Sequence, residues 1–214
     1  MAEIWHTLGE GDLGPPDGQV ASTQSRARQY AICVGLLLAV AFVAASIVSK
    51  VDRAAAPVYR VISGSMEPTL AVGQLVHIDK SAYVSSSPRI GEIIAFYGPA
   101  GAVSEVPVCG VQHSPGEGCP QPTPTESTKI FIKRVVAGPG ETVALVDGSV
   151  VRDGVTQDEP FAQPCGGDSG CNLPLQFEVP AGHWFLLGDN REHSDDSRYW
   201  GPVPKAWIIG SVLK

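Results

Sequence analysis

Residues 129–152 read KIFIKRVVAGPGETVALVDGSVVR. Branched and aromatic apolar residues fill two runs, Lys129–Ala137 and Thr142–Val146, which a Gly-Pro-Gly turn separates. A third run, Ser149–Arg152, follows the Asp-Gly pair at 147–148, and both of these residue types tolerate the positive φ that a two-residue hairpin requires. The stretch therefore predicts antiparallel strands joined by tight turns, and it indicates a mainly β fold.

Short apolar runs of the same kind recur along the rest of the chain. They alternate with turns rich in the 24 glycines and 18 prolines of the 214-residue sequence. No stretch after residue 48 keeps the 3.6-residue apolar spacing of a long amphipathic helix. A hydrophobic content of 43% is too high for a disordered chain. We therefore expect further strands at Pro57–Ile62, Gln74–Asp79, Glu92–Tyr97, His183–Leu187 and Trp207–Val212.

The charge balance argues against a nucleic-acid partner. The chain carries 15 Lys and Arg against 22 Asp and Glu, a net charge of −7, and it contains no basic run. Binding to nucleic acid begins with the neutralisation of phosphates by basic side chains. We expect no nucleic acid among the partners of this protein.

Tyr30–Val48 is an apolar run without a charged residue. At about 1.5 Å of rise per residue, a helix over this run would just cross a hydrocarbon layer of about 30 Å. A cleaved signal peptide has a shorter leader and a shorter apolar region, so the run predicts an uncleaved, single-pass anchor. The chain would then comprise a flexible cytoplasmic tail at 1–29, a transmembrane helix at 30–48 and one folded domain at 49–214.

Four of the five cysteines lie in Gly- and Pro-rich surroundings, and the fifth, Cys33, lies in the apolar run. Loop cysteines in a membrane-attached chain indicate disulfides and an oxidising compartment, so we expect the folded domain outside the cytoplasm. Three pairings are open, and we favour the local pairs Cys109–Cys119 and Cys165–Cys171. A metal site at Cys109, His113 and Cys119 is the alternative, although this spacing matches no common zinc pattern.

Residues 98–128 differ from the rest of the expected domain. They are rich in Gly and Pro and poor in large apolar residues, which predicts an insertion between two strands. A loop of this length in a compact domain is usually functional or mobile. One function that stays open is a non-catalytic, membrane-anchored β-domain that binds an extracytoplasmic partner through this insertion.

Two segments offer a nucleophile and a base. Residues 63–70 read SGSMEPTL and follow a predicted strand, and Gly64 permits a sharp turn that would expose the Ser65 hydroxyl. An ordinary Ser/Gly/Pro turn is the alternative. Lys133 and Arg134 lie inside an apolar strand and face opposite sides of it, so one of them could be buried. Burial lowers the pKa of a lysine and makes its amine a base; an edge-strand lysine that blocks aggregation is the alternative.

A third segment, residues 188–201, reads GDNREHSDDSRYWG. It is dense in carboxylates, guanidinium groups and hydroxyls that can hydrogen-bond to one another. A solvated polar turn is the alternative. His183 and His193 lie near Asp189, but neither stands in a recognisable Ser-His-Asp context.

Together and in order, these segments resemble the type I signal peptidases, the membrane-bound Ser-Lys leader peptidases. The family's Ser-Gly-Ser-Met-x-Pro-Thr-Leu motif is matched at 63–70, and its Gly-Asp-Asn-Arg-x-x-Ser-x-Asp-Ser-Arg motif at 188–198. Its Gly-acidic-hydrophobic motif is similar to residues 91–96. Its Lys-Arg motif resembles residues 133–140, with the Gly and Pro one position away from the commonest form.

The resemblance implies coiled antiparallel β-sheets behind a single N-terminal transmembrane helix. It implies a serine endopeptidase that removes signal peptides from translocated preproteins through an acyl-enzyme. Ser65 would be the nucleophile and Lys133 the general base. The Ser63 hydroxyl and the Ser65 backbone N–H match the family's oxyanion donors, and Ser194 matches the residue that orients the lysine. Asp196 and Arg198 match supporting residues.

The implied substrate is an extended peptide with small residues at the first and third positions before the cut. Such a peptide can add to a sheet edge and place alternate side chains in pockets. By position, Met66 and Ile132 would line those pockets. The expected partners are preproteins, the lipid bilayer and the secretion machinery, and we expect neither a cofactor nor a metal.

Overall fold

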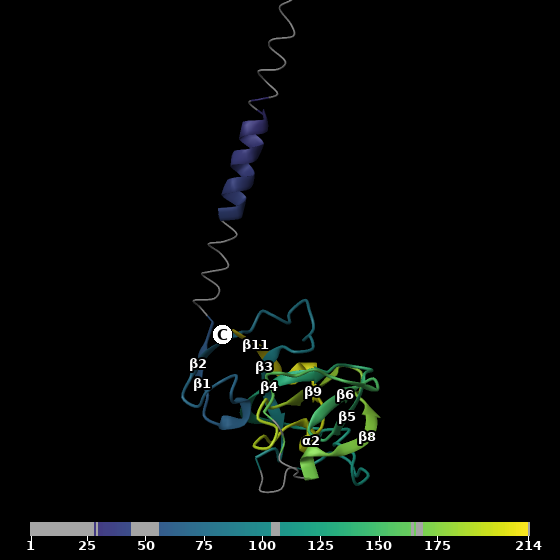
Figure 1. Ribbon diagram of the computed structural model, residues 1–214. Coiled ribbons are helices and arrows are strands. Elements are labelled where there is room, and N and C mark those ends of the chain that lie inside the picture. The colour runs from purple at the N-terminus through teal and green to yellow at the C-terminus, as the bar shows by residue number, and fades with distance from the viewer. Residues whose placement is uncertain are drawn as a thin grey trace, which may run out of the picture. The chain divides into compact units, whose positions relative to one another are not determined.

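The computed structural model describes residues 28, 30–43, 56–103, 108–163, 165 and 169–213. The chain divides into two units, Met1–Asp52 and Arg53–Lys214, whose elements are drawn in Figure 1. The tail expected at 1–29 lies outside the described residues apart from Arg28, and so do residues 44–48 of the expected transmembrane helix.

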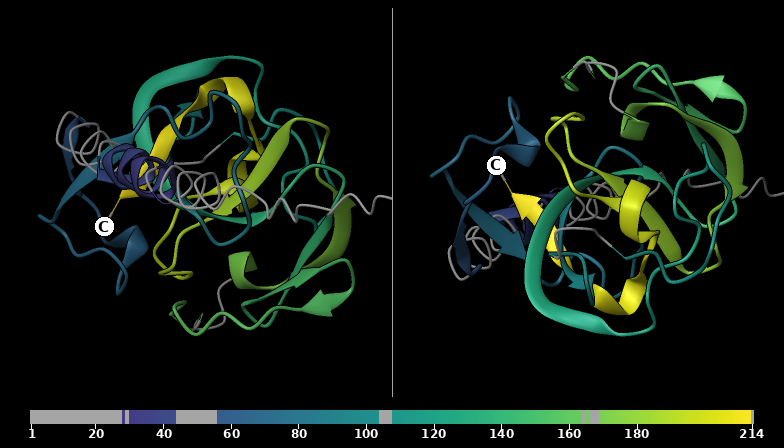
Figure 2. Two further views of the ribbon diagram at one scale, coloured as in Figure 1. Left: turned by 90° about the horizontal axis from the view of Figure 1, so that it is seen from above. Right: turned by 90° about the horizontal axis from the view of Figure 1, so that it is seen from below.

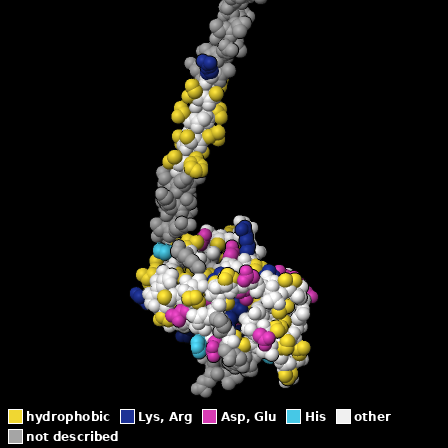
Figure 3. Space-filling model, viewed as in Figure 1, with side chains coloured by type: hydrophobic (Ala, Val, Ile, Leu, Met, Phe, Trp, Pro, Cys, Tyr) yellow, Lys and Arg dark blue, Asp and Glu magenta, His cyan; other side chains and the backbone are white. Residues whose placement is uncertain are grey.

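In the first unit, residues 30–43 form a helix. Its large apolar side chains are exposed, and Figure 3 shows hydrophobic side chains along the visible face of this helix. Within the described ranges, no helix is both long enough and apolar enough to cross a membrane.

The second unit is mainly β, as predicted, and its larger sheet has seven antiparallel strands. The strands follow one another across the sheet in the order β1 (Val58–Arg60), β2 (Leu75–Asp79), β11 (Ile208–Leu213), β3 (Ile93–Pro99), β4 (Glu126–Ala137), β9 (His183–Leu187) and β10 (Val203–Pro204).

A smaller antiparallel sheet has four strands, and Figure 1 shows β5, β6 and β8 grouped away from β1 and β2. Its order is β7 (Val155–Thr156), β6 (Ser149–Arg152), β5 (Thr142–Val146) and β8 (Leu173–Glu178). The predicted hairpin between β5 and β6 is confirmed, because Val146 pairs with Ser149 and the two turn residues, Asp147 and Gly148, have φ of 49° and 79°. The short helices are η1 (Gly64–Met66), η2 (Ser169–Cys171), α2 (Ser197–Trp200) and η3 (Lys205–Trp207).

Strand β4 of the larger sheet also contacts the smaller sheet. It pairs with β3 from Glu126 to Arg134 and with β9 from Arg134 to Ala137, and Figure 2 shows its strong curvature. Val136 and Ala137 at its end pack in one apolar cluster with Val143 and Leu145 of β5. A second cluster lies beneath β2, β3 and β11 and includes Met66 and Leu70.

The predicted strands lie where the sequence placed them, with ends that differ by a few residues. Strands β7, β8 and β10 were not predicted. β8 reads LPLQFE and β10 reads VP, and a proline usually marks a break in a strand. The inserted segment is shorter than predicted, because β3 extends to Pro99 and β4 begins at Glu126. The backbone N–H of Cys119 in this segment donates to the Arg198 carbonyl at 2.9 Å.

Both predicted disulfides are confirmed. Cys109 is bonded to Cys119 and Cys165 to Cys171. The alternative metal site at Cys109, His113 and Cys119 is therefore wrong, because the disulfide leaves neither cysteine a thiolate with which to bind a metal.

Candidate functional site

The turn that follows β1, residues 63–70, is called the serine turn here because it carries two serine hydroxyls side by side. Ser63 Oγ and Ser65 Oγ are 3.2 Å apart and hydrogen-bonded. Ser65 lies in η1 and is partly exposed, whereas the next residue, Met66, is 2% exposed and packs in the core. The buried Met66 side chain therefore anchors a turn whose hydroxyls remain accessible.

Lys133 lies in the middle of β4, opposite Ile94 of β3. The residue is 2% exposed, and its Nζ donates a 2.8 Å hydrogen bond to Ser194 Oγ. Burial lowers the pKa of Lys133 to about 8, against an opposing effect of the Asp196 carboxylate. The sequence predicted that one of Lys133 and Arg134 could be buried. Both are buried, since Arg134 is only 7% exposed.

A buried ion pair supports the loop that carries Ser194. Arg198 Nε donates to Asp196 Oδ1 at 2.7 Å, and Arg198 Nη2 donates to Asp196 Oδ2 at 2.9 Å and to the Ser194 carbonyl at 2.8 Å. Burial alone would raise the pKa of Asp196, but the Arg198 guanidinium holds it below its usual value. Asp196 also accepts the Gly188 N–H at 3.1 Å. The ionised Asp196–Arg198 pair thus holds the backbone at Gly188, before Ser194, and at Ser194 itself.

Gly188 marks the point where the serine turn meets the lysine. A Cβ at this position would clash with both Ser194 Oγ and the Ser65 carbonyl oxygen. Lys133 Nζ lies 2.8 Å from the same Ser194 Oγ. Gly188 therefore has the Ser65 carbonyl oxygen on one side and the Ser194 hydroxyl that binds the Lys133 amine on the other. Residues 65, 133 and 194, far apart in sequence, therefore share one site.

The two residues predicted to line substrate pockets belong to the core beneath this site. Met66 is buried in the cluster under β2 and β3, and Ile132 is partly buried and packs against the same cluster. Their proximity agrees with a shared apolar wall, and their contact with substrate stays a prediction.

Sequence reasoning missed the role of Asn190. Its backbone N–H donates to the Ser65 carbonyl at 3.1 Å, and its Nδ2 donates to the Gly64 carbonyl at 3.2 Å. In the sequence, Asn190 stands out only as part of the motif at 188–198. Its place in that motif, two residues after Gly188, was the available signal, but a contact across more than 120 residues cannot be read from spacing.

A second ion pair was also missed. Arg134 donates to both oxygens of Asp189, at 2.7 and 2.5 Å, and Thr69 Oγ1 donates to Asp189 Oδ2 at 2.5 Å. Asp189 is fully buried, and the Arg134 guanidinium stacks 3.8 Å from the centre of the Phe161 ring. Strand β4 is thereby tied to the serine turn by the residue that follows Lys133.

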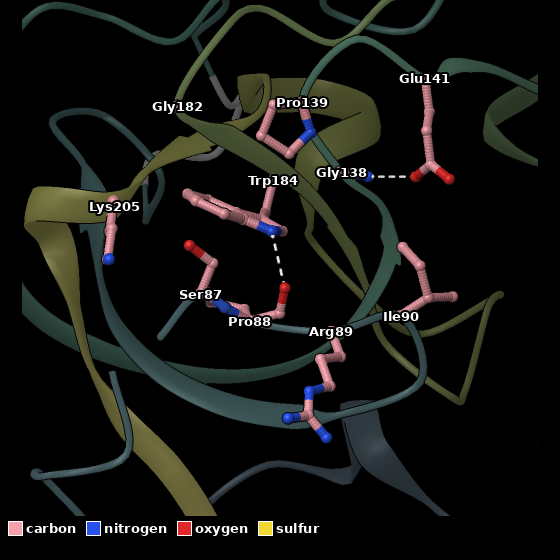
Figure 4. Close-up of a pocket in the computed structure, with 10 residues that line it drawn as sticks. All are labelled: Ser87, Pro88, Arg89, Ile90, Gly138, Pro139, Glu141, Gly182, Trp184 and Lys205. Atoms are coloured by element: carbon pink, nitrogen blue, oxygen red, sulfur yellow. Dashed lines mark hydrogen bonds between the residues drawn. The ribbon is translucent and has the colours of Figure 1, made fainter. Parts of the chain in front are cut away.

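A separate cavity of about 570 Å³ opens on another part of the unit (Figure 4). Trp184 lies in it and donates through Nε1 to the Pro88 carbonyl at 3.1 Å. None of the site residues lines this cavity, whose walls are Ser87, Pro88, Arg89, Ile90, Gly138, Pro139, Glu141, Gly182, Trp184 and Lys205. In the described part of the chain, no three His, Cys, Asp or Glu side chains are grouped so that they could hold a metal ion.

Known proteins match the chain over most of the length that contains this site. Residues 28–213 match the family described as signal peptidase, peptidase S26. A probable signal peptidase I-1 from Synechocystis is 37% identical over 152 residues, which are 71% of this chain and 66% of that protein. Thylakoidal processing peptidase 1, chloroplastic, from Arabidopsis thaliana is 33% identical over 153 residues, 69% of this chain and 38% of that protein.

A crystal structure of a signal peptidase I from Enterococcus faecalis V583 covers 60% of this chain and 98% of that chain at 25% identity. Its TM-score of 0.38 is too low for the superposition to support an argument. The chain spans less than two thirds of the length of the Synechocystis and Arabidopsis relatives. The match to the family nevertheless takes in residues from the N-terminal helix to the last strand, and the chain belongs to the signal peptidase, peptidase S26 family.

Proposed function

We propose that this protein is a membrane-anchored serine endopeptidase that removes N-terminal signal peptides from translocated preproteins, with Ser65 as nucleophile and Lys133 as general base. The observation that carries the proposal is the buried Lys133 amine, hydrogen-bonded to Ser194 where the Ser65 turn meets Gly188. Nucleophile, base and base-orienting group are the parts that acyl transfer through a serine requires.

The lowered pKa of Lys133 supplies a usable base. A lysine with its ordinary pKa of 10.5 is neutral in about one molecule in 3,000 at pH 7, whereas a pKa of about 8 leaves about one in ten neutral. The neutral amine still donates one hydrogen bond to Ser194, which directs its lone pair. General bases work best when their pKa lies near the working pH.

In the acylation step, the Lys133 amine takes the Ser65 proton while Ser65 Oγ bonds to the scissile carbonyl carbon. Negative charge develops on the carbonyl oxygen, and the Ser65 N–H and the Ser63 hydroxyl are the donors that would stabilise it. The Lys133 ammonium then gives its proton to the leaving amine as the C–N bond breaks. An ester on Ser65 remains.

In the deacylation step, Lys133 takes a proton from a water molecule whose oxygen attacks the ester carbon. The same two donors stabilise the oxyanion a second time. The ammonium returns its proton to Ser65 Oγ as the C–O bond breaks. The products are the new C-terminal carboxylate and the free enzyme.

The substrate in this proposal is an extended segment with small residues at the first and third positions before the cut. It would pair with a strand edge beside Ser65, and its side chains would enter pockets walled by Met66 and Ile132. The partners are preproteins, the lipid bilayer and the secretion machinery. Anchorage through residues 30–48 would raise the effective concentration of the enzyme at the membrane, and the two disulfides favour an extracytoplasmic domain.

The test is cleavage of a preprotein with an Ala-x-Ala site by the full chain in detergent, with the product identified by mass. Ser65→Ala and Lys133→Ala should each abolish cleavage, and Lys133→Arg should also fail because a guanidinium stays protonated. Lys129→Ala, at an exposed position of the same strand, is the matched control and should cleave normally. No cleavage by the wild type would refute the proposal in favour of the non-catalytic binding domain, and an active Lys133→Ala would refute the dyad.

A further inference from the structure

Two consecutive residues after β9 hold the serine turn at both of its ends. Asn190 donates to the Gly64 and Ser65 carbonyls at the start of the turn. Asp189 accepts the Thr69 hydroxyl at its end. Among the described residues, these three hydrogen bonds tie residues 63–70 to the rest of the unit, because the remaining ones, such as Leu70 N–H to the Met66 carbonyl, lie within this segment.

The Asp189 carboxylate does not need Thr69 for charge balance. Arg134 already contacts both of its oxygens, and Arg134 Nη1 is fixed by the Gly91 carbonyl at 2.7 Å. The carboxylate is therefore a rigid, ionised acceptor held by the strand that carries Lys133. A hydrogen bond to such an acceptor is stronger and more directional than one between neutral groups.

We propose that Thr69 is a positioning residue for the nucleophile: its hydroxyl, held by the Arg134–Asp189 pair, sets the serine turn against the strand of the general base. The inference rests on the proposed function. Thr69 does not reach the reacting atoms. It acts through the backbone of the turn, which aims the Ser65 N–H and the two serine hydroxyls at the scissile carbonyl. A misplacement of about 1 Å in such a site can cost about 100-fold in rate.

The experiment compares Thr69→Val, which keeps the shape and removes the donor, with Thr69→Ser, which keeps the donor. Single-turnover cleavage of a preprotein with enzyme in excess is measured across pH. We expect Thr69→Val to lower the acylation rate constant 10- to 100-fold and Thr69→Ser to stay within about threefold of the wild type. The acid limb of the pH profile should not move, because the substitution removes no charge. The charged groups that act on the pKa of Lys133 all remain, namely Asp196, Arg198, Asp195 and Asp189.

A purely structural role would give a different result. As long as folded enzyme stays in saturating excess over the preprotein, a loss of folded enzyme leaves the single-turnover rate constant unchanged, whereas a misplaced nucleophile lowers it. Amide hydrogen exchange gives a second readout, in which peptides covering 63–70 should exchange faster in Thr69→Val while those covering β4 do not. Thr69→Ala provides a second variant without the donor, should Thr69→Val fold poorly.

The inference is overturned if both variants without the hydroxyl keep the wild-type rate constant, if Thr69→Ser is as slow as they are, or if the acid limb moves with the substitution. A wild-type protein that cleaves no preprotein would instead refute the proposed function. In that event the exchange comparison still decides whether Thr69 holds the turn.

Discussion

The Nζ atom of Lys133 donates a 2.8 Å hydrogen bond to Ser194 Oγ at a position where the lysine is 2% exposed. One hydroxyl cannot replace the water that an ammonium group loses on burial. The free energy of ionisation therefore shifts toward the neutral amine, and the pKa falls to about 8. The same burial that lowers the pKa of Lys133 thus destabilises the folded protein wherever the lysine is charged.

Replacing Lys133 with methionine should therefore stabilise the fold while it abolishes cleavage. The unfolded lysine keeps its proton up to about pH 10.5 and the folded one only to about pH 8, so the unfolded state binds more protons in this window and the free energy of unfolding rises with pH. The difference corresponds to about 3 kcal/mol. At pH 7 we expect Lys133→Met to gain about 2–3 kcal/mol in urea unfolding.

The gain should shrink as the pH rises from 8 toward 10.5 and vanish above it. Lys129→Met, at an exposed position of the same strand, is the control and should change the free energy of unfolding little at either pH. A Lys133→Met variant less stable than the wild type at pH 7 would mean that the ammonium is well solvated in the folded protein.

Removing the exposed carboxylate of Asp195 should make the enzyme faster in acid. The Asp195 charge raises the pKa of Lys133, so Asp195→Asn should lower it and move the acid limb of the single-turnover profile to lower pH. At a pH below the limb, the rate should rise up to about threefold, and it should be unchanged on the plateau. Glu192→Gln, an exposed carboxylate of the same loop, is the control, and an equal movement of the limb in both variants would contradict the prediction.

Loss of the Ser63 hydroxyl should slow catalysis without weakening binding. Ser63 Oγ lies 3.2 Å from Ser65 Oγ, and removal of an oxyanion donor typically lowers kcat about 10²- to 10³-fold. Ser63→Ala should show this loss in steady-state cleavage with KM nearly constant, and Ser85→Ala at an exposed position should show none. If Ser63→Ala raised KM and left kcat unchanged, the hydroxyl would contribute to substrate binding and not to stabilisation of the transition state.

A methyl group at position 188 should separate the nucleophile from the base. The added Cβ of Gly188→Ala would clash with both Ser194 Oγ and the Ser65 carbonyl oxygen. We expect at least a 100-fold loss in kcat, with a loss of unfolding free energy of about 1–3 kcal/mol from overpacking. Gly138→Ala, where a Cβ meets its nearest neighbour at 3.5 Å, is the matched control. A fully active Gly188→Ala would show that the two halves of the site need not approach so closely.

The strands that carry the site were predictable because their patterns are local. Alternating apolar residues and the Asp-Gly pair between β5 and β6 specify strands and a turn over a few residues. The serine and lysine segments were found through motifs, since each segment alone is explained better as an ordinary turn or an edge strand. The local disulfides were favoured by short spacing in turn-rich sequence.

The contacts that complete the site were not predictable in the same way. Thr69 and Asp189 are 120 residues apart, and nothing in their spacing indicates that one donates to the other. The burial of both Lys133 and Arg134 depends on partners that come from β9 and the loop after it. Strands with prolines, such as β8, were missed because the rule that proline breaks strands is a tendency that tertiary contacts override.

Successive side chains of β4 carry a titratable amine and a guanidinium that stays protonated. A slip of this strand by a single residue would exchange the two, and the position beside Ser194 would then hold a cation unable to accept a proton. The pairing of β4 with β9 is irregular between Val135 and Ala137, and an irregularity of this kind helps to fix the register of a strand. The alignment of β4 with its neighbours thus decides whether an amine or a guanidinium lies beside Ser194.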